Sequence, residues 1–312
     1  MDKPRLIVIG GPTASGKSAA AVRLCQRIGG QVISSDSMQI YRGMDIGTAK
    51  PTEEEMGGIP HHLLSIAEPG EKYSAAAYRE LATQAIQSVY ASGEQPVVCG
   101  GTGLYIDALT KPMSFAEHNE DETLRKELSA LSETMVGKMR LHQMLKEIDP
   151  ESAARLHIND VRRVIRAIEV YRTTGRTITE QTRLDKEREG DYSVVMFALE
   201  WPREILYDRI NKRVDVMIKN GLIDEVRTLL NNGLSEGSTA MQALGYKEIV
   251  AALNGRISMN EAIDDIKQGS RHYAKRQLTW FRRDERVHWI QASGKSLDQI
   301  VDEMIKEIES HA

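Results

Sequence analysis

The sequence has little cysteine, no long apolar run and no large excess of charge of either sign. Its 312 residues include two cysteines, Cys25 and Cys99, which are too few for a cysteine-rich zinc site or a disulfide framework. The apolar run near the N-terminus, Leu6 to Ile9, is too short for a signal peptide or a membrane span. We therefore expect a cytoplasmic protein that makes no membrane contact and keeps its thiols reduced.

The charge balance also excludes one class of protein. The 41 Lys and Arg residues are outnumbered by 45 Asp and Glu, for a formal net charge of -4. A protein that coats nucleic acid with a basic surface is excluded, whereas a local basic patch is not. The ordinary composition, 41% hydrophobic and 28% charged, excludes a disordered chain or a collagen and is compatible with a monomer.

Strands alternate with helices along the first third of the chain. Short apolar runs predict strands at 5–10, 31–36 and 95–101, with helices over 17–28 and 74–90 between them. Later strands are expected at 193–201 and 287–292, and capping boxes at Ser258 and Ser296 open helices that end near 282 and 309. This alternation predicts an α/β fold, a parallel sheet with helices on both faces.

The middle of the chain has a different character. Between about 113 and 191 there is no convincing strand, and polar helices are predicted at 122–131, 138–148, 151–156 and 160–174, the last capped by Asn159. We expect an all-helical insertion over 113–191 within an α/β core formed by 1–112 and 192–312.

A glycine-rich segment follows the first strand and opens the first helix. It reads GPTASGKS and fits the phosphate-loop pattern G-x-x-x-x-G-K-[ST] in its required strand-to-helix context. Its backbone N–H groups would bind phosphate, Lys17 would add a charge and the Ser18 hydroxyl would ligate Mg²⁺. The alternative is a structural turn. The predicted phosphate-binding residues are Gly11, Pro12, Thr13, Ala14, Ser15, Gly16, Lys17 and Ser18.

The acid that usually accompanies a phosphate loop is not at the end of the third strand, which ends in glycines. Asp36, after the second strand, lies instead at the carboxyl edge of the sheet, where open α/β sheets bind ligands. It could act as a general base, hold a metal through water, or cap a turn. Thr102, in the glycine-rich turn after the third strand, should face the same edge.

Two regions are locally basic. Arg162, Arg163 and Arg166 share one helix face by their spacing, and the stretch 271–286 mixes Arg and Lys with Tyr273, Trp280 and Phe281. Such regions can neutralise phosphates while aromatic side chains stack on bases. The alternative is a solvated helix face whose aromatic residues pack into the core.

The combination of motifs resembles the bacterial tRNA dimethylallyltransferases (tRNA isopentenyltransferases, the IPP transferase family). The blocks that carry the resemblance cover nearly the whole chain: GPTASGKS, SSDSMQIYRGMDIGTAKP, IPHHLL, GGTGLY, NDVRRVIRAIEVYRTTGRTITE, INKRVDVMIKNGLIDEV, QALGYKEI and AKRQLTWFRR. The resemblance implies a P-loop NTPase-like core and Mg²⁺-dependent transfer of a dimethylallyl group. The donor would be dimethylallyl pyrophosphate, and the acceptor the N6 amine of the adenine 3′-adjacent to the anticodon. Eukaryotic relatives carry an extra zinc finger, for which this chain lacks the cysteines.

The resemblance also implies roles for single residues. Asp36 would be the general base, Thr102 would lie near the target base, and Arg213 would face the pyrophosphate held by Thr13, Lys17 and Ser18. The helical insertion would grip the anticodon stem. The implied tRNA contacts are Asp36, Ser37, Met38, Gln39, Thr102, Arg125 (by a looser alignment), Arg162, Arg163, Val164, Ile165, Arg166, Gln242, Ala243, Leu244, Gly245, Tyr246, Lys247, Lys275, Arg276, Gln277, Trp280, Arg282 and Arg283.

Three other functions compete with this interpretation. A small-molecule kinase would use the phosphate loop for ATP, and a non-catalytic module would only bind RNA. An isopentenyltransferase acting on free adenine nucleotides would not need the long insertion or the basic C-terminal region, which argue against it.

Overall fold

The computed structural model describes residues 3–115 and 122–311. Its contacts divide the chain into two compact units, one of Met1–Thr110 with Tyr192–Ala312 and one of Lys111–Asp191. We call them the core unit and the helical unit. Among the described helices, not one has both the length and the apolar character that a membrane span requires.

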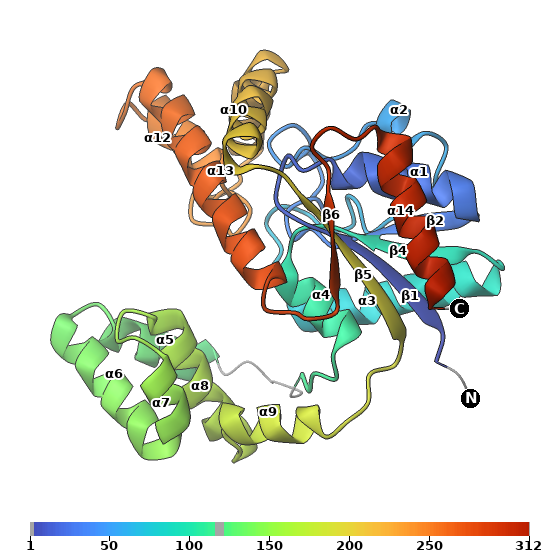
Figure 1. Ribbon diagram of the computed structural model, residues 1–312. Coiled ribbons are helices and arrows are strands. Elements are labelled where there is room, and N and C mark those ends of the chain that lie inside the picture. The colour runs from blue at the N-terminus through green and yellow to red at the C-terminus, as the bar shows by residue number, and fades with distance from the viewer. Residues whose placement is uncertain (1–2, 116–121, 312) are drawn as a thin grey trace. The chain divides into compact units, whose positions relative to one another are not determined.

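The core unit is built on one six-stranded sheet (Figure 1). The strands are β1 (Arg5–Gly10), β2 (Gly30–Ser34), β3 (His61–His62), β4 (Gln95–Cys99), β5 (Ser193–Glu200) and β6 (Val287–Gln291). Their order is β3-β2-β4-β1-β5-β6 and every pairing is parallel, as the sequence predicts. Loops that follow the strands therefore meet at one edge of the sheet. The two-residue β3 was not predicted, because it is too short to show a pattern.

Helices cover both faces of the sheet (Figure 1). Alternate side chains of β1 point to opposite faces: Ile7 and Ile9 pack with α1 (Lys17–Ile28) and α14 (Leu297–Ser310). Leu6 and Val8 pack with α3 (Ala75–Ala91) and α4 (Gly103–Thr110). The strands thus have two apolar faces, which explains why they appear in the sequence as continuous apolar runs.

A further cluster of helices packs against the segment that follows β2. The cluster consists of α10 (Arg203–Lys219), α11 (Leu222–Asn231), α12 (Tyr246–Leu253) and α13 (Met259–Phe281). The short helix α2 (Glu53–Met56) is a separate element earlier in the chain. Ile40, Tyr41 and Met44 are buried against residues of these helices. The predicted capping box of α13 is present, with the Ser258 hydroxyl accepting from Glu261 N. This packing holds the loop after β2 in place.

The helical unit contains α5 (Glu122–Leu131), α6 (Met135–Ile148), α7 (Pro150–Arg155), α8 (Val161–Thr174) and α9 (Ile178–Lys186). The first four correspond to the predicted helices, whereas α9, of which no residue is fully buried, was not predicted. The prediction that Asn159 caps α8 is wrong. Asp160 holds that position, makes no side-chain capping bond, and accepts instead from His157 N.

Candidate active site

The phosphate loop has the backbone that its glycines predict. Between β1 and α1, Gly11 and Gly16 have φ values of 132° and 94°, in the region that favours glycine, and Ala14 is held at 62°. The first turn of α1 contains no acidic residue and no side chain caps it. The helix therefore presents the positive end of its dipole and its first N–H groups to an anion.

The loop is tied to the rest of the core unit by three side chains. Gln277 accepts a hydrogen bond from Thr13 N at 2.9 Å and donates to Gly101 O at 3.0 Å. Trp201 donates to Ser15 O and Arg209 to Ala14 O, both at 2.9 Å. The Gln277 side chain is largely buried and joins two loops of the site, and its predicted contact with tRNA stays a prediction.

The turn after β4 requires its glycines for a physical reason. A Cβ on Gly101 would meet Gln277 Nε2 at 2.1 Å, and one on Gly100 would meet Ser35 O at 2.4 Å. Larger residues would push this turn away from the phosphate loop and from the segment that carries Asp36. The turn is therefore part of the site, whereas the sequence alone left it open as a plain strand-to-helix connection.

Asp36 lies two residues beyond the end of β2 and so follows the strand, as expected, although the strand ends at Ser34 and not at 36 as predicted. Its Oδ1 accepts from Met38 N at 2.9 Å and from Gln39 N at 3.4 Å. Next to it, the Thr102 hydroxyl accepts from Ser37 N at 3.0 Å. Oδ1 therefore makes the turn-capping contact, while Oδ2 has no hydrogen-bond partner within 3–115 and 122–311 and is available to a ligand.

Two cations lie in poorly hydrated surroundings near Asp36. Burial lowers the pKa of Lys17. The nearby Arg213 lowers this pKa further, whereas the Asp36 carboxylate raises it. Burial likewise lowers the pKa of Arg213, against the raising effect of Asp36. Lys17 Nζ donates to Pro12 O at 3.3 Å, within its own loop. Cations that have lost hydration and repel one another are stabilised by an anion placed between them.

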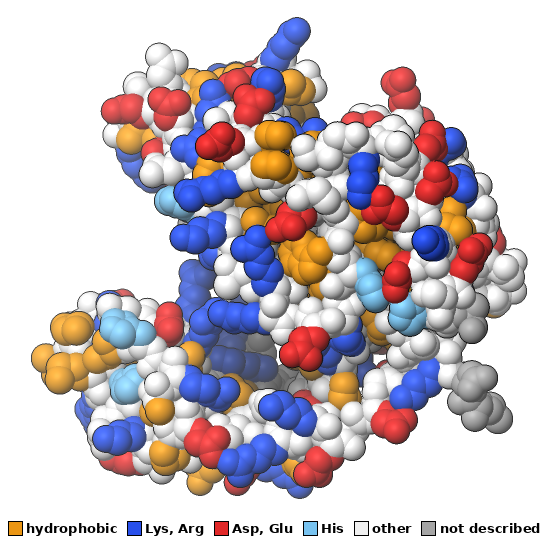
Figure 2. All heavy atoms as spheres, viewed as in Figure 1, with side chains coloured by type: hydrophobic (Ala, Val, Ile, Leu, Met, Phe, Trp, Pro, Cys, Tyr) orange, Lys and Arg blue, Asp and Glu red, His pale blue; other side chains and the backbone are white. Residues whose placement is uncertain are grey.

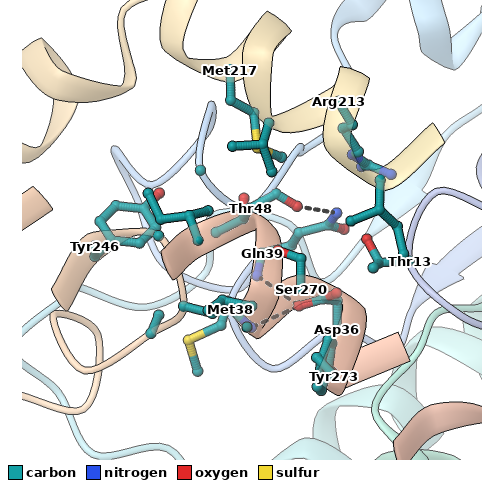
Figure 3. A pocket seen from close by; sticks show the side chains of 18 of the residues that line it. Thr13, Asp36, Met38, Gln39, Thr48, Arg213, Met217, Tyr246, Ser270 and Tyr273 are labelled. Carbon is teal, nitrogen blue, oxygen red and sulfur yellow. Dashed lines mark hydrogen bonds between the residues drawn. The ribbon is translucent and has the colours of Figure 1, made fainter. Parts of the chain in front are cut away.

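These groups surround one cavity of about 470 Å³ in the core unit (Figure 3). Thr13, Lys17, Ser18, Asp36 and Arg213 form its polar wall. Several apolar side chains line the cavity as well, namely Met38, Ile210, Val214, Met217, Leu244 and Ile266, together with further polar ones. A lining that combines cationic and apolar side chains suits a ligand that has a phosphate group and a hydrocarbon part.

Tyr273 of α13 also lines the cavity, although the sequence had singled it out only as part of a basic and aromatic stretch. Burial, together with the Asp36 charge, raises the pKa of its hydroxyl to about 12. The Arg276 guanidinium lies 5.5 Å from the centre of its ring. The phenol is therefore protonated and can donate a hydrogen bond inside the site.

The structure separates the predicted tRNA contacts of the core unit into two groups. Ser37, Met38, Gln39, Gln242, Ala243, Leu244, Gly245, Lys247 and Arg276 line the same cavity, and Lys275 and Arg283 are exposed. Tyr246, Trp280 and Arg282 make contacts within the core unit, and their predicted contacts with tRNA stay predictions. The Tyr246 side chain is fully buried in the cavity wall and donates to Glu225 Oε1 at 2.6 Å. Trp280 packs against Phe281, and Arg282 pairs with Glu200 at 3.0 Å.

The predicted tRNA contacts in the helical unit include both buried and exposed side chains. Val164 and Ile165 are buried in its core, so their side chains cannot meet a ligand, while Arg162 and Arg163 are exposed on α8. Arg125 makes a bidentate pair with the buried Glu169, at 2.7 and 2.8 Å. This pair joins α5 to α8, which gives Arg125 a structural role beside any contact with RNA.

One acid that shapes the site is not marked by any motif in the sequence. Glu225 of α11 accepts hydrogen bonds from Asp45 N, Ile46 N and Gly47 N at 2.7–3.0 Å, as well as from Tyr246. Gly47 lines the cavity. Its three backbone partners lie about 180 residues earlier in the chain, so local spacing does not reveal these contacts.

The fold and the site together define an α/β protein of the phosphate-loop class, with a carboxylate beside a cavity that suits a phosphorylated ligand with a hydrocarbon part. Comparison with known proteins narrows this class. The family model described as IPP transferase matches residues 39–284. The chain belongs to the IPP transferase family.

Relatives and solved structures agree with this assignment. The tRNA dimethylallyltransferase of Carboxydothermus hydrogenoformans is 48% identical over 97% of each chain, and that of Halalkalibacterium halodurans is 46% identical over 97% of this chain and 96% of its own. The crystal structure of tRNA delta(2)-isopentenylpyrophosphate transferase from Staphylococcus epidermidis matches with 43% identity and a TM-score of 0.74, over 99% of this chain and 100% of its own. A eukaryotic dimethylallyltransferase captured acting on tRNA matches with 28% identity and a TM-score of 0.79, over 93% of this chain and 74% of its own.

Proposed function

We propose that this protein transfers a dimethylallyl group from dimethylallyl pyrophosphate to the N6 amine of the adenine 3′-adjacent to the anticodon in tRNA, and releases pyrophosphate. One observation carries the proposal: Asp36 and the phosphate loop line the same cavity, whose two poorly hydrated cations call for an anion and whose lining also includes apolar side chains. Membership of the IPP transferase family and the names of the relatives support the same reaction.

The donor would bind by both of its parts. The first N–H groups of α1, Lys17 and Arg213 would hold the pyrophosphate, and the apolar wall formed by Val214 and Met217 would take the dimethylallyl group. As the bond from the allylic carbon to oxygen breaks, negative charge grows on the pyrophosphate. Hydrogen-bond donors and cations that are already in place stabilise that charge without reorganisation. This stabilisation would supply most of the rate enhancement.

Ser18 is the proposed Mg²⁺ ligand. Its hydroxyl is at the start of α1 and lines the same cavity as the Asp36 carboxylate, so hard oxygen donors are available at the polar end. Mg²⁺ prefers such donors together with water and phosphate oxygens, and the residues present therefore fit it. When bound, the ion would neutralise charge on the leaving pyrophosphate.

Asp36 is the proposed general base. The amine nitrogen forms a bond to the allylic carbon while the carbon–oxygen bond breaks and its electron pair leaves with the pyrophosphate. The proton released by the amine passes to Oδ2 of Asp36, since Oδ1 already accepts from Met38 N and Gln39 N. To reach the cavity, the adenine would have to leave its stack in the anticodon loop. Thr102, bonded to Ser37, would position the neighbouring backbone.

The proposed partner in this reaction is tRNA. Lys275, Arg276 and Arg283 on the core unit and Arg162 and Arg163 on the helical unit are exposed basic side chains suited to phosphate contacts. We propose that the helical unit binds the anticodon stem. We propose that the protein acts on tRNA as a monomer. Because its substrate would be tRNA, the proposal also retains the expected cytoplasmic location.

The deciding experiment combines purified protein, unmodified tRNA and labelled dimethylallyl pyrophosphate. We expect label to enter tRNA, and none to enter a transcript in which guanine replaces the target adenine. Label in free adenine nucleotides but not in tRNA would contradict the proposal in favour of a nucleotide isopentenyltransferase. A melting temperature raised by ATP and unaffected by dimethylallyl pyrophosphate would favour a kinase, and tRNA binding without transfer a binding module.

A further inference from the structure

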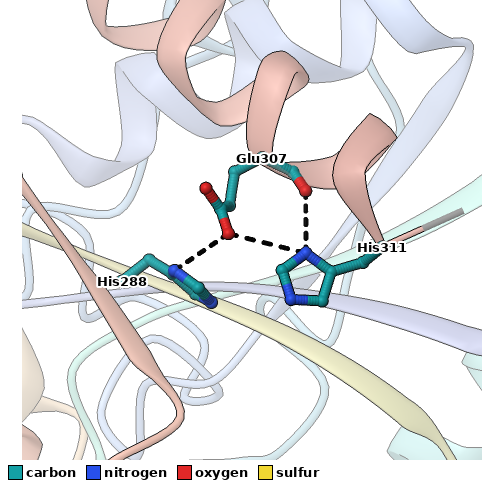
Figure 4. A group of neighbouring side chains, drawn as sticks. All are labelled: His288, Glu307 and His311. Atoms are coloured by element: carbon teal, nitrogen blue, oxygen red, sulfur yellow. Dashed lines mark hydrogen bonds and ion pairs between the residues drawn. The ribbon is translucent and has the colours of Figure 1, made fainter.

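A second group of chemically reactive side chains lies away from the cavity, between the edge strand β6 and the last turns of α14. It consists of His288, Glu307 and His311, which we call the histidine cluster (Figure 4). Among the described residues this is the single place where three side chains of the metal-binding types bring ligand atoms within 4.8 Å of one another. None of the three lines the cavity described above.

The distances within the cluster fit a tetrahedral metal ion. His288 Nδ1 lies 3.2 Å and His311 Nδ1 lies 3.5 Å from the same oxygen, Glu307 Oε1. Zinc bonds of about 2.0–2.1 Å to nitrogen and oxygen place tetrahedral ligands about 3.3–3.4 Å apart. Two edges of the tetrahedron are therefore already formed, and the third ligand distance is no more than 4.8 Å.

The helix and strand hold these side chains in place. Glu307 and His311 are four residues apart at the end of α14, so they share one face of the helix. His288 extends from β6 with its ring 6.0 Å from that of Phe197, and its ring also meets that of His311 at 5.4 Å. Figure 4 shows both imidazole rings turned toward the Glu307 carboxylate.

The cluster can also admit an ion at little cost. Its side chains are 36–45% exposed, so a hydrated ion can reach them and keep a water as fourth ligand. His311 Nδ1 would give up its contact with Glu307 O at 2.9 Å, but that carbonyl still accepts from the Ser310 hydroxyl at 2.8 Å. The carbonyl therefore keeps a partner after the exchange.

We propose that His288, Glu307 and His311 form a binding site for one divalent transition-metal ion of the Zn²⁺ type. Two imidazoles and one carboxylate are ligands that Zn²⁺ accepts, with the fourth position open to water. The ion would join α14 to the edge strand β6, which has a neighbouring strand on one side only. Its role is structural attachment of the C-terminal helix, separate from the proposed transfer reaction.

The test is a Zn²⁺ titration of the full chain without an affinity tag, after chelator treatment and dialysis, in excess Mg²⁺ to occupy the phosphate-loop site. We expect one equivalent of Zn²⁺ to bind and to raise the melting temperature by a few degrees, because the native state alone presents the three ligands together. Co²⁺ in place of Zn²⁺ should give the visible absorption of a four-coordinate site.

Single substitutions decide where the ion binds. His288→Ala, His311→Ala and Glu307→Gln should each weaken Zn²⁺ binding by a factor of about 10 or more, because each removes one of only three protein ligands. Glu309→Gln on the same helix and His157→Ala in the helical unit are matched controls that should leave it unchanged. Circular dichroism of the metal-free variants checks that each has folded.

Two results would overturn the proposal. Absence of Zn²⁺ binding to the parent chain would mean that the cluster is only an ion pair between imidazole and carboxylate. Equal affinity in the parent, His288→Ala and Glu307→Gln would place the ion elsewhere. Neither result bears on the transfer reaction, which is assayed with Mg²⁺ alone.

Discussion

At the scale of single residues, Asp36 is expected to decide the rate of transfer. Asp36→Ala should lower the turnover rate by a factor on the order of 10² or more, the usual contribution of a positioned general base. Binding of tRNA should change much less, because one carboxylate adds little to an interface dominated by phosphates. Single-turnover transfer and a filter-binding measurement separate the two effects.

Asp36→Asn is the informative companion variant. The amide oxygen can still accept from Met38 N and Gln39 N, so the turn should persist while the proton acceptor is removed. A rate as low as that of the Ala variant would assign the effect to proton transfer. Turnover close to the parent rate in both variants would show that Asp36 is not the base.

Lys17 and Arg213 are expected to act on the leaving group. Lys17→Ala and Arg213→Ala should each reduce kcat/KM for dimethylallyl pyrophosphate by about 10² or more, because each removes a charge from the oxygens that become more negative in the transition state. Removal of Mg²⁺ by a chelator should impair the same step. Lys212→Ala, an exposed neighbour paired with Asp208, is the control. Unchanged donor kinetics in Arg213→Ala would remove that residue from the site.

At the scale of secondary-structure elements, one acid connects α11 to the segment that carries the site. The Glu225 carboxylate accepts from three consecutive backbone N–H groups, those of Asp45, Ile46 and Gly47. Gln39, which lines the cavity, donates in turn to Thr48 O and Ala49 O at 3.3 and 3.1 Å. The position of the loop around Asp36 therefore depends on a helix far along the chain.

Glu225→Gln should destabilise the protein and the loop together. The new amide places a donor against groups that are themselves donors, so we expect a loss of about 2–3 kcal/mol in the free energy of unfolding and a higher KM for the allyl donor. Asp224 is exposed on the same helix and paired with Arg227. Asp224→Asn removes the same charge but breaks none of the Glu225 contacts, so it should change neither the free energy of unfolding nor the KM. Urea denaturation and steady-state kinetics of both variants measure the effects. If the two variants behaved alike, Glu225 would have no positioning role.

At the scale of the whole molecule, acidic and basic side chains are interspersed on the face that Figure 2 shows. The pairs Arg23–Asp298 and Arg27–Asp302, at 2.6 Å, illustrate this arrangement on the core unit. Because the net charge is -4, affinity for tRNA must come from local groups of basic residues. Arg162 and Arg163 on α8 are such a group.

Replacement of Arg162 and Arg163 by Ala should weaken tRNA binding and reduce its dependence on salt. The log–log slope should fall by up to about 1.4–1.8, because each phosphate that is no longer neutralised reduces it by about 0.7–0.9. Binding of dimethylallyl pyrophosphate should not change. The double variant Arg23→Ala, Arg27→Ala removes the same charge from residues already paired within the chain and should leave the slope as it is. Equal slopes for the parent and the α8 variant would mean that this face is only solvated surface.

The sequence by itself determined those features that depend on neighbouring residues or on the order of strands. The phosphate loop is predictable because its glycines, lysine and serine act through the local backbone between β1 and α1. Asp36 and Thr102 are predictable because parallel strands bring their following loops to one edge of the sheet. The helices that begin at Ser258 and Ser296 were predicted from capping boxes that the structure contains.

Only the tertiary structure decided which side of each element is buried. Val164, Ile165, Tyr246 and Gln277 lie in blocks that suggest contact with RNA, but their side chains are used for packing or for holding loops. The Glu225 contacts and the histidine cluster join residues far apart in the chain or on different elements, and no spacing in the sequence reveals them. The physical reason is that local patterns set the course of the backbone, whereas the environment of a side chain depends on which distant segments pack against it.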